Sequence, residues 1–214
     1  KGEILGIIGH TGSGKSTLVS HLNGLMKATS GKVFIDGKDI WENKSEIRKI
    51  RSKVGLVFQY PEYQLFEETV YKDIAFGPKN IGMTEEETHK AVLDSAKLMK
   101  VRDNMLEKSP FDLSGGQKRR VAIAGVMAME PEIIIFDEPT AGLDPSGRET
   151  IFKAIRDYRK KKNATVIIVS HSMEDIAAIC DKVLVMNGGE VALFGETREV
   201  FSKKDLLKEK GLNV

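Results

Sequence analysis

The chain has 214 residues, of which 41% are hydrophobic and 30% are charged, an ordinary globular balance that suits one α/β domain or a core with a subdomain. Its net charge of +2 gives no global basic field for nucleic acid, although a local patch is not excluded. The lone Cys180 excludes an intrachain disulfide and indicates a buried, inert thiol in a reducing compartment, and we expect neither a membrane span nor a signal peptide.

The first predicted element is a phosphate-binding loop. Residues 3–8 favour a short buried strand and residues 16–25 favour a helix. The pattern G-x-x-x-x-G-K-[ST] lies between them, in Gly9, His10, Thr11, Gly12, Ser13, Gly14, Lys15 and Ser16, followed by Thr17. In this context, backbone N–H groups and the helix dipole converge on one phosphate chain. We expect Lys15 to reach the β- and γ-phosphates and the Ser16 hydroxyl to bind Mg²⁺.

The next segments predict an antiparallel flank and a second strand. Residues 31–40 favour a hairpin with Asp36-Gly37 at its turn, and the basic residues 45–53 favour a solvated helix or loop. Residues 53–59 favour a buried strand ending in Gln59, a side chain that can bind Mg²⁺ or water. The large apolar groups of residues 60–66 are either packed under the loop or presented to a partner.

Short charged helices dominate the middle of the chain. Residues 68–76 favour a helix that Gly77-Pro78 ends, and a capping box at 84–87 opens a helix to about residue 100. Ser114 is a good N-cap for a helix over 118–129, which makes a possible second anion site, although such a sequence usually forms only a cap. We therefore predict a helical subdomain over about 59–129, inserted into a core of about 1–58 and 130–214.

The second half returns to strands. Residues 133–139 favour a central parallel strand that ends in Asp137 and Glu138. Ligands of open α/β sheets bind at the carboxyl ends of strands, so Asp137 is placed to hold Mg²⁺ and Glu138 to act as general base for water. Residues 164–170 favour another buried strand, after which His171 is placed to contact a γ-phosphate or water. The predicted elements that follow are a loop over 141–145, helices over 146–162 and 173–180, strands over 182–186 and 190–194, and a helical tail over 197–210.

Taken together, these motifs resemble the ABC transporter ATPase family over nearly the whole chain. The combination of LSGGQ at 113–117 with IIIFDEPT at 133–140 is the most specific part of the resemblance. It implies a P-loop NTPase core with a mostly parallel sheet, an antiparallel β flank and an inserted α-helical subdomain, using ATP and Mg²⁺. It also implies two such domains head to tail, with a signature segment acting in trans on the nucleotide of the other domain. The positions that match this pattern are Gln59 (Q-loop), Ser114, Gly115, Gly116 and Gln117 (signature), Asp137 and Glu138 (Walker B and catalytic Glu), Asp144 (D-loop) and His171 (switch His).

A finer resemblance links the chain to the ATP-binding subunits of energy-coupling-factor importers of vitamins and transition-metal ions. Its most distinctive part is QYPE…LF at residues 59–66. It implies a peripheral location on the cytoplasmic face of the cell membrane, with a transmembrane coupling subunit, a small membrane solute-binding subunit and a second ATPase subunit, identical or paralogous. The loop that receives the transmembrane partner would carry Tyr60, Tyr63, Leu65 and Phe66.

Two parts of the family pattern are expected to lie outside this sequence: the adenine-stacking aromatic residue, upstream of the first strand, and the C-terminal helical extension. The alternative is a soluble ABC ATPase without a membrane partner, in iron–sulfur assembly or associated with DNA or ribosomes. The DNA type carries long coiled coils and the ribosomal type carries two cassettes, which this sequence lacks. A P-loop kinase would leave LSGGQ without a role, and we expect no nucleic-acid partner.

Overall fold

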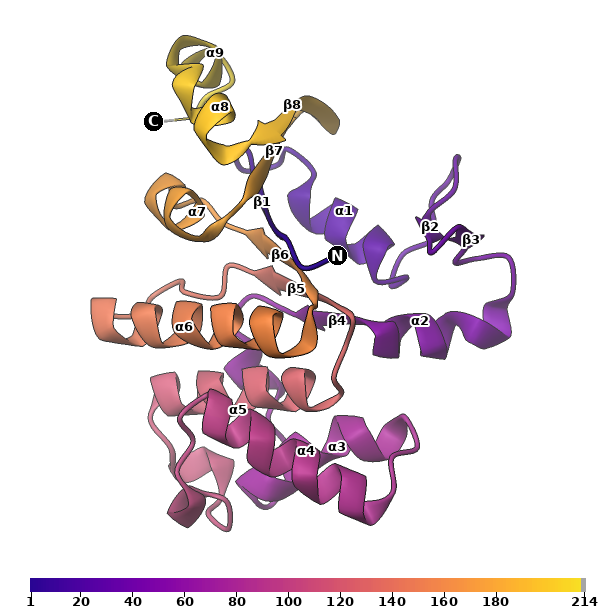
Figure 1. The fold of residues 1–214 in the computed structure, drawn as a ribbon, viewed down its shortest axis with the longest axis vertical. Coiled ribbons are helices and arrows are strands. Elements are labelled where there is room, and N and C mark those ends of the chain that lie inside the picture. The colour runs from indigo at the N-terminus through magenta and orange to yellow at the C-terminus, as the bar shows by residue number, and fades with distance from the viewer. Residues whose placement is uncertain (213–214) are drawn as a thin grey trace.

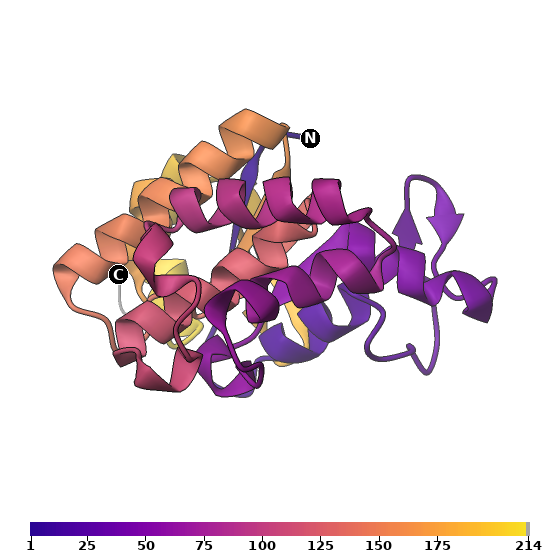
Figure 2. The ribbon, with the colours of Figure 1, turned by 90° about the horizontal axis from the view of Figure 1, so that it is seen from below.

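The computed structural model describes residues 1–212 and is centred on a six-stranded sheet in the order β4-β5-β6-β1-β7-β8. Neighbouring strands are parallel except β7 and β8, which are antiparallel. The strands are β1 (Ile4–Ile8), β4 (Val54–Val57), β5 (Ile133–Asp137), β6 (Thr165–Val169), β7 (Lys182–Asn187) and β8 (Glu190–Glu196). The predicted mostly parallel α/β fold with an antiparallel part is therefore confirmed, but the antiparallel pair at the edge of the sheet is β7 and β8 and not the hairpin at residues 31–40. The predicted hairpin, β2 (Phe34–Ile35) and β3 (Lys38–Asp39), forms a separate two-stranded sheet that projects to one side in Figures 1 and 2.

Helices cover both faces of the sheet, as Figure 1 shows. On one face, Val19 of helix α1 (Lys15–Leu22) packs against Ile7, Ile135 and Ile167. On the other face, Phe136 and its apolar neighbours join a larger core with helices α5 (Gly115–Ala128), α6 (Pro145–Lys162) and α7 (Met173–Ile179). The longer helices are α1 (Lys15–Leu22), α2 (Ile47–Lys53), α3 (Val70–Asn80), α4 (Glu85–Leu98), α5 (Gly115–Ala128), α6 (Pro145–Lys162), α7 (Met173–Ile179), α8 (Thr197–Ser202) and α9 (Lys204–Glu209). The 3₁₀ turns are η1 (Lys44–Glu46), η2 (Pro61–Gln64), η3 (Asp103–Met105) and η4 (Pro110–Asp112).

Helices α3, α4 and α5 pack against one another below the sheet in Figure 1, and α5 also contacts β4. The predicted capping box is present at α4, where the Thr84 side chain accepts a hydrogen bond from the Glu87 N–H and the Glu87 carboxylate accepts from the Thr84 N–H. The basic segment 45–53 was predicted to be either a helix or a loop. It is helical, since it forms most of η1 and all of α2. Among residues 1–212, the structure holds no helix whose length and apolar character would suffice to cross a bilayer.

The structure corrects three predicted helix boundaries. Helix α1 ends at Leu22 instead of residue 25. Helix α3 continues through Gly77 and Pro78 to Asn80 instead of ending at residue 76. Pro78 removes a single hydrogen bond near the end of the helix, while its side chain is buried. A Cβ on Gly77 would lie 2.7 Å from Met129 Cγ, so glycine permits the close approach of α3 to α5 that outweighs its low helix propensity. Helix α5 begins at Gly115, directly after its N-cap Ser114, and not at residue 118.

Candidate active site

The predicted phosphate loop connects the end of β1 to the start of α1. Gly12 and Gly14 have φ values of 81° and 98°, in the region that favours glycine. A Cβ on Gly9 would lie 2.4 Å from Ser13 Oγ and 2.5 Å from the Met186 carbonyl oxygen, so only glycine fits there. The first-turn N–H groups of α1 have no partner within their own helix and face the end of this loop. The loop therefore has the conformation that an anion site requires.

Lys15 lies inside the loop. Its Nζ donates hydrogen bonds to the carbonyl oxygens of Gly9 at 2.8 Å and His10 at 3.0 Å, and its side chain is buried. Burial lowers the pKa of the Lys15 amine, while the nearby Glu138 and Asp137 oppose that shift. The buried Ser13 Oγ has no hydrogen-bond partner among residues 1–212. An ammonium donor and an orphaned hydroxyl in a glycine-rich cradle fit a phosphate chain.

The residues predicted to bind Mg²⁺ come from three elements at one edge of the sheet. Ser16 Oγ donates to Asp137 Oδ2 at 3.3 Å, and burial raises the pKa of Asp137. Gln59 follows β4, the strand that pairs with β5, and its side chain is exposed. No cluster of three or more His, Cys, Asp or Glu residues within residues 1–212 could form an all-protein metal cage. A hydroxyl, a carboxylate and an amide suit Mg²⁺, which uses one or two carboxylates together with substrate phosphates.

Glu138 has an unusual environment and an unusual backbone. Its φ is 50°, and its N–H donates to the Val169 carbonyl at 2.9 Å, which fixes the residue beside the end of β6. The side chain is 12% exposed, and its Oε1 has no hydrogen-bond partner in the part of the chain that the structure describes. Burial, together with the neighbouring Asp137, raises the pKa of Glu138 from 4.5 to about 7. A carboxyl group with this pKa can take up and release a proton near neutral pH.

His171 lies next to Glu138, at the carboxyl end of β6. Its Nε2 is 3.5 Å from Glu138 Oε1, and its side chain is half exposed. Burial and the positive charge of Lys15 lower the pKa of His171, so the neutral imidazole is favoured near pH 7. The structure thus brings His171, Glu138, Asp137, Ser16 and the phosphate loop to one place.

The signature residues lie elsewhere in the chain. Ser114, Gly116, Gln117 and Asp144 line a hollow of about 490 Å³, and no residue of the phosphate loop borders it. Gly115 begins helix α5 and is exposed. The Gln117 side chain accepts a hydrogen bond from the Ser114 N–H at 2.9 Å, and Asp144 Oδ1 accepts one from the Gly147 N–H at 3.0 Å. Within one chain, these residues therefore do not join the site at the sheet edge.

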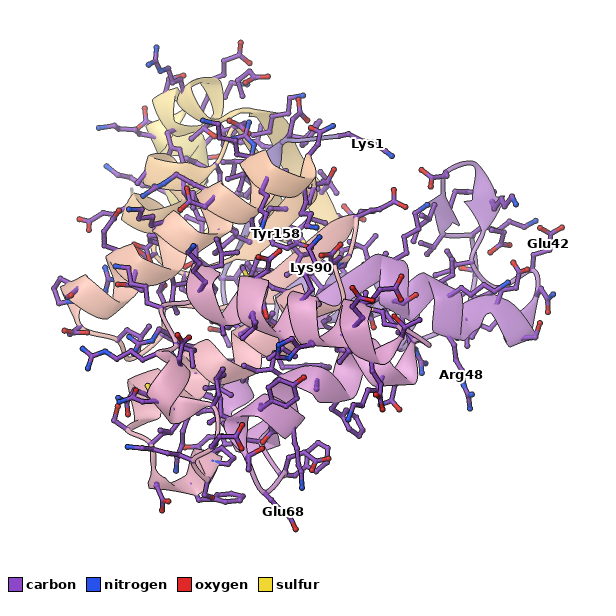
Figure 3. All side chains as sticks on the ribbon, turned by 60° about the horizontal axis from the view of Figure 1, so that its bottom comes forward. Lys1, Glu42, Arg48, Glu68, Lys90 and Tyr158 are labelled. Atoms are coloured by element: carbon purple, nitrogen blue, oxygen red, sulfur yellow. The ribbon has the colours of Figure 1, made fainter. Side chains whose placement is uncertain are left out.

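The segment after Gln59 combines both alternatives that the sequence left open. Tyr63 is 85% exposed, and Phe66 is exposed and stacks edge-on against Phe76 at 4.8 Å. Leu65 instead packs against the core. Beside this segment, an apolar groove of about 400 Å³ runs between η2, α3 and α5. Glu68, which follows this segment in the chain, points away from the molecule in Figure 3.

Two features of the site were not predicted. His10 Nε2 lies 3.1 Å from Asn187 Oδ1, and the Gly189 N–H donates to the Ser13 carbonyl at 3.1 Å, so the β7–β8 turn supports the phosphate loop. The Asn187-Gly188-Gly189 turn was visible in the sequence, but its position required knowing that β7 pairs with β1. The second feature is Arg119, which is buried beneath the ring of Tyr60.

One family model, described as ABC transporter, matches residues 1–141. The chain belongs to the ABC transporter family. This ABC ATPase is 56% identical over 212 residues to the energy-coupling factor transporter ATP-binding protein EcfA2 of Caldanaerobacter subterraneus subsp. tengcongensis, a match that covers 99% of this chain and 74% of that protein. It is 58% identical over 214 residues to the EcfA2 protein of Clostridium perfringens, covering 100% of this chain and 75% of that protein. The predicted resemblance to ATP-binding subunits of energy-coupling-factor transporters is confirmed.

Solved structures give the same family for this ABC ATPase. It superimposes with a TM-score of 0.86 and 41% identity on cbiO1 from Clostridium perfringens, described as part of the ABC transporter complex cbiONQ, covering 100% of this chain and 85% of that one. It also matches a dimeric structure of the ATP-binding cassette MJ0796 bound to ADP and Pi, with a TM-score of 0.80 and 32% identity, covering 92% of this chain and 86% of that one.

Proposed function

We propose that this ABC ATPase binds ATP at the Gly9–Thr17 loop and hydrolyses it to power an energy-coupling-factor importer of vitamins or transition-metal ions. The observation that carries the proposal is the convergence of Lys15, Ser16, Asp137, Glu138 and His171 at one edge of the sheet. The phosphate chain of ATP would replace the carbonyl partners of the Lys15 amine. Thr17, in the first turn of α1, would add its N–H and hydroxyl to the same phosphates.

The residues that would hold Mg²⁺ are Ser16, Asp137 and Gln59. Bound there, the ion would neutralise phosphate charge. The Ser16 hydroxyl is already hydrogen-bonded to the Asp137 carboxylate, and the Gln59 amide follows the neighbouring strand β4. All three groups offer oxygen atoms, the ligands that Mg²⁺ prefers.

Glu138 is the proposed general base. Its carboxylate accepts a proton from the attacking water, and its pKa of about 7 allows the residue to hold that proton during the step. His171 would donate a hydrogen bond to the γ-phosphate or to the water, and its 3.5 Å distance to Glu138 Oε1 supports a shared role. A buried carboxyl held beside a strand end keeps its orientation without further reorganisation.

The signature residues Ser114–Gln117 and the D-loop residue Asp144 would act on the nucleotide held by a second ATPase subunit, identical or paralogous. Support comes from the separate hollow that they line, which no residue of the phosphate loop borders, and from the likeness to a dimeric ATP-binding cassette. The helical part, residues about 59–129, would move as a subdomain against the core of about 1–58 and 130–214 when ATP closes this dimer.

The membrane partners would dock at Tyr60, Tyr63, Leu65 and Phe66. The exposed aromatic residues and the apolar groove beside them are features of a surface that binds another protein. The partners are a transmembrane coupling subunit and a small membrane solute-binding subunit, which would hold this chain at the cytoplasmic face of the membrane. The cbiO1 protein, described as part of a transporter complex, supports this assembly.

The Glu138→Gln variant tests the proposal. It keeps the size and the hydrogen-bonding oxygen but removes the base, so we expect ATP hydrolysis to fall by at least about 100-fold. ATP binding should persist, and the variant with ATP should elute as a closed dimer on size exclusion. The exposed Glu107→Gln exchange serves as the control. Hydrolysis by the Glu138→Gln variant at the wild-type rate would refute the role of Glu138.

A further inference from the structure

Arg119 of helix α5 is bonded to two segments that are distant in the sequence. Its Nε and Nη2 donate to the two carboxylate oxygens of Glu62 at 2.9 and 2.7 Å, and its Nη1 donates to the Ala141 carbonyl. The Arg119 side chain is 4% exposed and that of Glu62 is 14% exposed. Interaction with Arg119 holds the pKa of Glu62 below its usual value, although burial opposes this shift. Both groups are therefore charged and shielded from water.

The contact between Arg119 and Glu62 fixes the orientation of the two side chains as well as the distance between them. A guanidinium with two parallel hydrogen bonds to a carboxylate is planar and oriented, unlike the point charge of a lysine. The Arg119 Cζ also lies 5.5 Å from the centre of the Tyr60 ring. Tyr60 has φ and ψ of 55° and 55°, a left-handed conformation that a bulky residue keeps only when its surroundings impose it. Arg119 thus holds the whole turn from Tyr60 to Gln64.

The other end of the contact lies in the turn that follows Glu138. The Ala141 N–H donates to the Glu138 carbonyl at 3.2 Å, and the Leu143 N–H donates to the Thr140 carbonyl at 3.1 Å. These bonds close the turn that runs from Glu138 toward Asp144. A displacement of the Ala141 carbonyl would therefore act directly on the backbone that carries Glu138.

We propose that Arg119 is a positioning residue that couples the turn at residues 60–64 to the turn at residues 138–144. A displacement of Glu62 would pull the guanidinium, and the guanidinium would move the Ala141 carbonyl together with helix α5. The positioning role of Arg119 rests on the proposed function in one respect: a membrane partner bound at Tyr63 would displace the turn at residues 60–64. The mechanical link between the two turns is a property of this chain alone.

Amide hydrogen exchange of the purified, nucleotide-free protein tests the link. In Glu62→Gln and in Arg119→Lys, we expect the Tyr63, Ala141 and Leu143 amides to exchange at least about tenfold faster, because each variant loses part of a buried charge-assisted contact. The control is Arg156→Lys, since Arg156 donates to Glu149 at the same 2.7 Å but on the exposed surface of α6.

A variant without buried charge separates coupling from stability. Glu62→Leu with Arg119→Met replaces both ions by apolar groups and should unfold at a temperature close to that of the wild type. In this double variant, we expect the Ala141 and Leu143 amides to exchange as fast as in the single variants. Slow exchange of these amides in the double variant, or faster exchange confined to Tyr63 in Glu62→Gln, would overturn the coupling.

Kinetics provide the second readout. In Arg119→Lys, kcat for ATP should fall while KM is unchanged, because Arg119 does not touch the phosphate loop; a change in KM alone would contradict the role. A wild-type protein that does not hydrolyse ATP would overturn the proposed function, whereas the exchange of Ala141 and Leu143 would still decide the coupling. The two failures are thus distinguishable.

Discussion

The most informative perturbation of this molecule is the removal of the Glu138 charge in the nucleotide-free protein. Burial raises the pKa of Glu138 from 4.5 to about 7, so between those pH values the folded state retains a proton that the unfolded state has released. The free energy of unfolding therefore falls as pH rises through this window. The difference of pKa corresponds to a loss of about 3 kcal/mol at pH values above 7.

Glu138→Gln removes this pH-dependent loss of unfolding free energy, since an amide does not titrate. We expect urea unfolding to show that the variant and the wild type have similar stability near pH 4.5, and that the variant is more stable by up to about 3 kcal/mol at pH 8. The exposed Glu107→Gln exchange should leave the wild-type pH dependence unchanged. If the free energy of unfolding of Glu138→Gln falls with pH as steeply as that of the wild type, Glu138 is not a desolvated carboxyl and its pKa is not raised.

Three further predictions concern the phosphate loop and the partner surface. Gly9→Ala should distort the loop and weaken ATP binding in calorimetry, because the new Cβ would lie 2.4 Å from Ser13 Oγ; unchanged affinity would contradict the packing. Lys15→Ala should weaken ATP binding by about 10- to 150-fold through the loss of charge-assisted hydrogen bonds, and tight binding would exclude Lys15 as a phosphate ligand. Tyr63→Ala should leave thermal unfolding unchanged, since the side chain is 85% exposed, but should abolish capture of membrane partners from detergent extracts; full capture would rule out this surface.

Much of the fold and of the site edge was predictable because local signals agree there. The continuous apolar strand before Asp137 and the glycine pattern before Lys15 each specify a buried strand and its end, and the carboxyl ends of parallel strands meet at one edge. The pKa of Glu138 was not predictable, since it depends on burial by residues distant in the sequence.

Other features depend on tertiary packing that overrides local preference. Gly77-Pro78 predicts the end of a helix, yet close packing of α3 against Met129 carries the helix past it. The segment after Gln59 has no helical period and nevertheless forms η2, because Arg119 holds Glu62 across a separation of 57 residues. Arg119 is one of three consecutive basic residues, Lys118 to Arg120, after the signature segment, and nothing local indicates which of them makes such a contact.

The measurement that bears most directly on the proposed function is the identification of what copurifies with this protein, tagged and extracted in mild detergent from the membranes of the cells that make it. We expect a transmembrane coupling subunit, a small solute-binding membrane protein and either one or two kinds of ATPase subunit, with ATP hydrolysis in the purified complex. A pair of permease subunits without a small binding protein would indicate a different type of ABC importer. Recovery of an active ATPase with no membrane protein at all would contradict a role in transport.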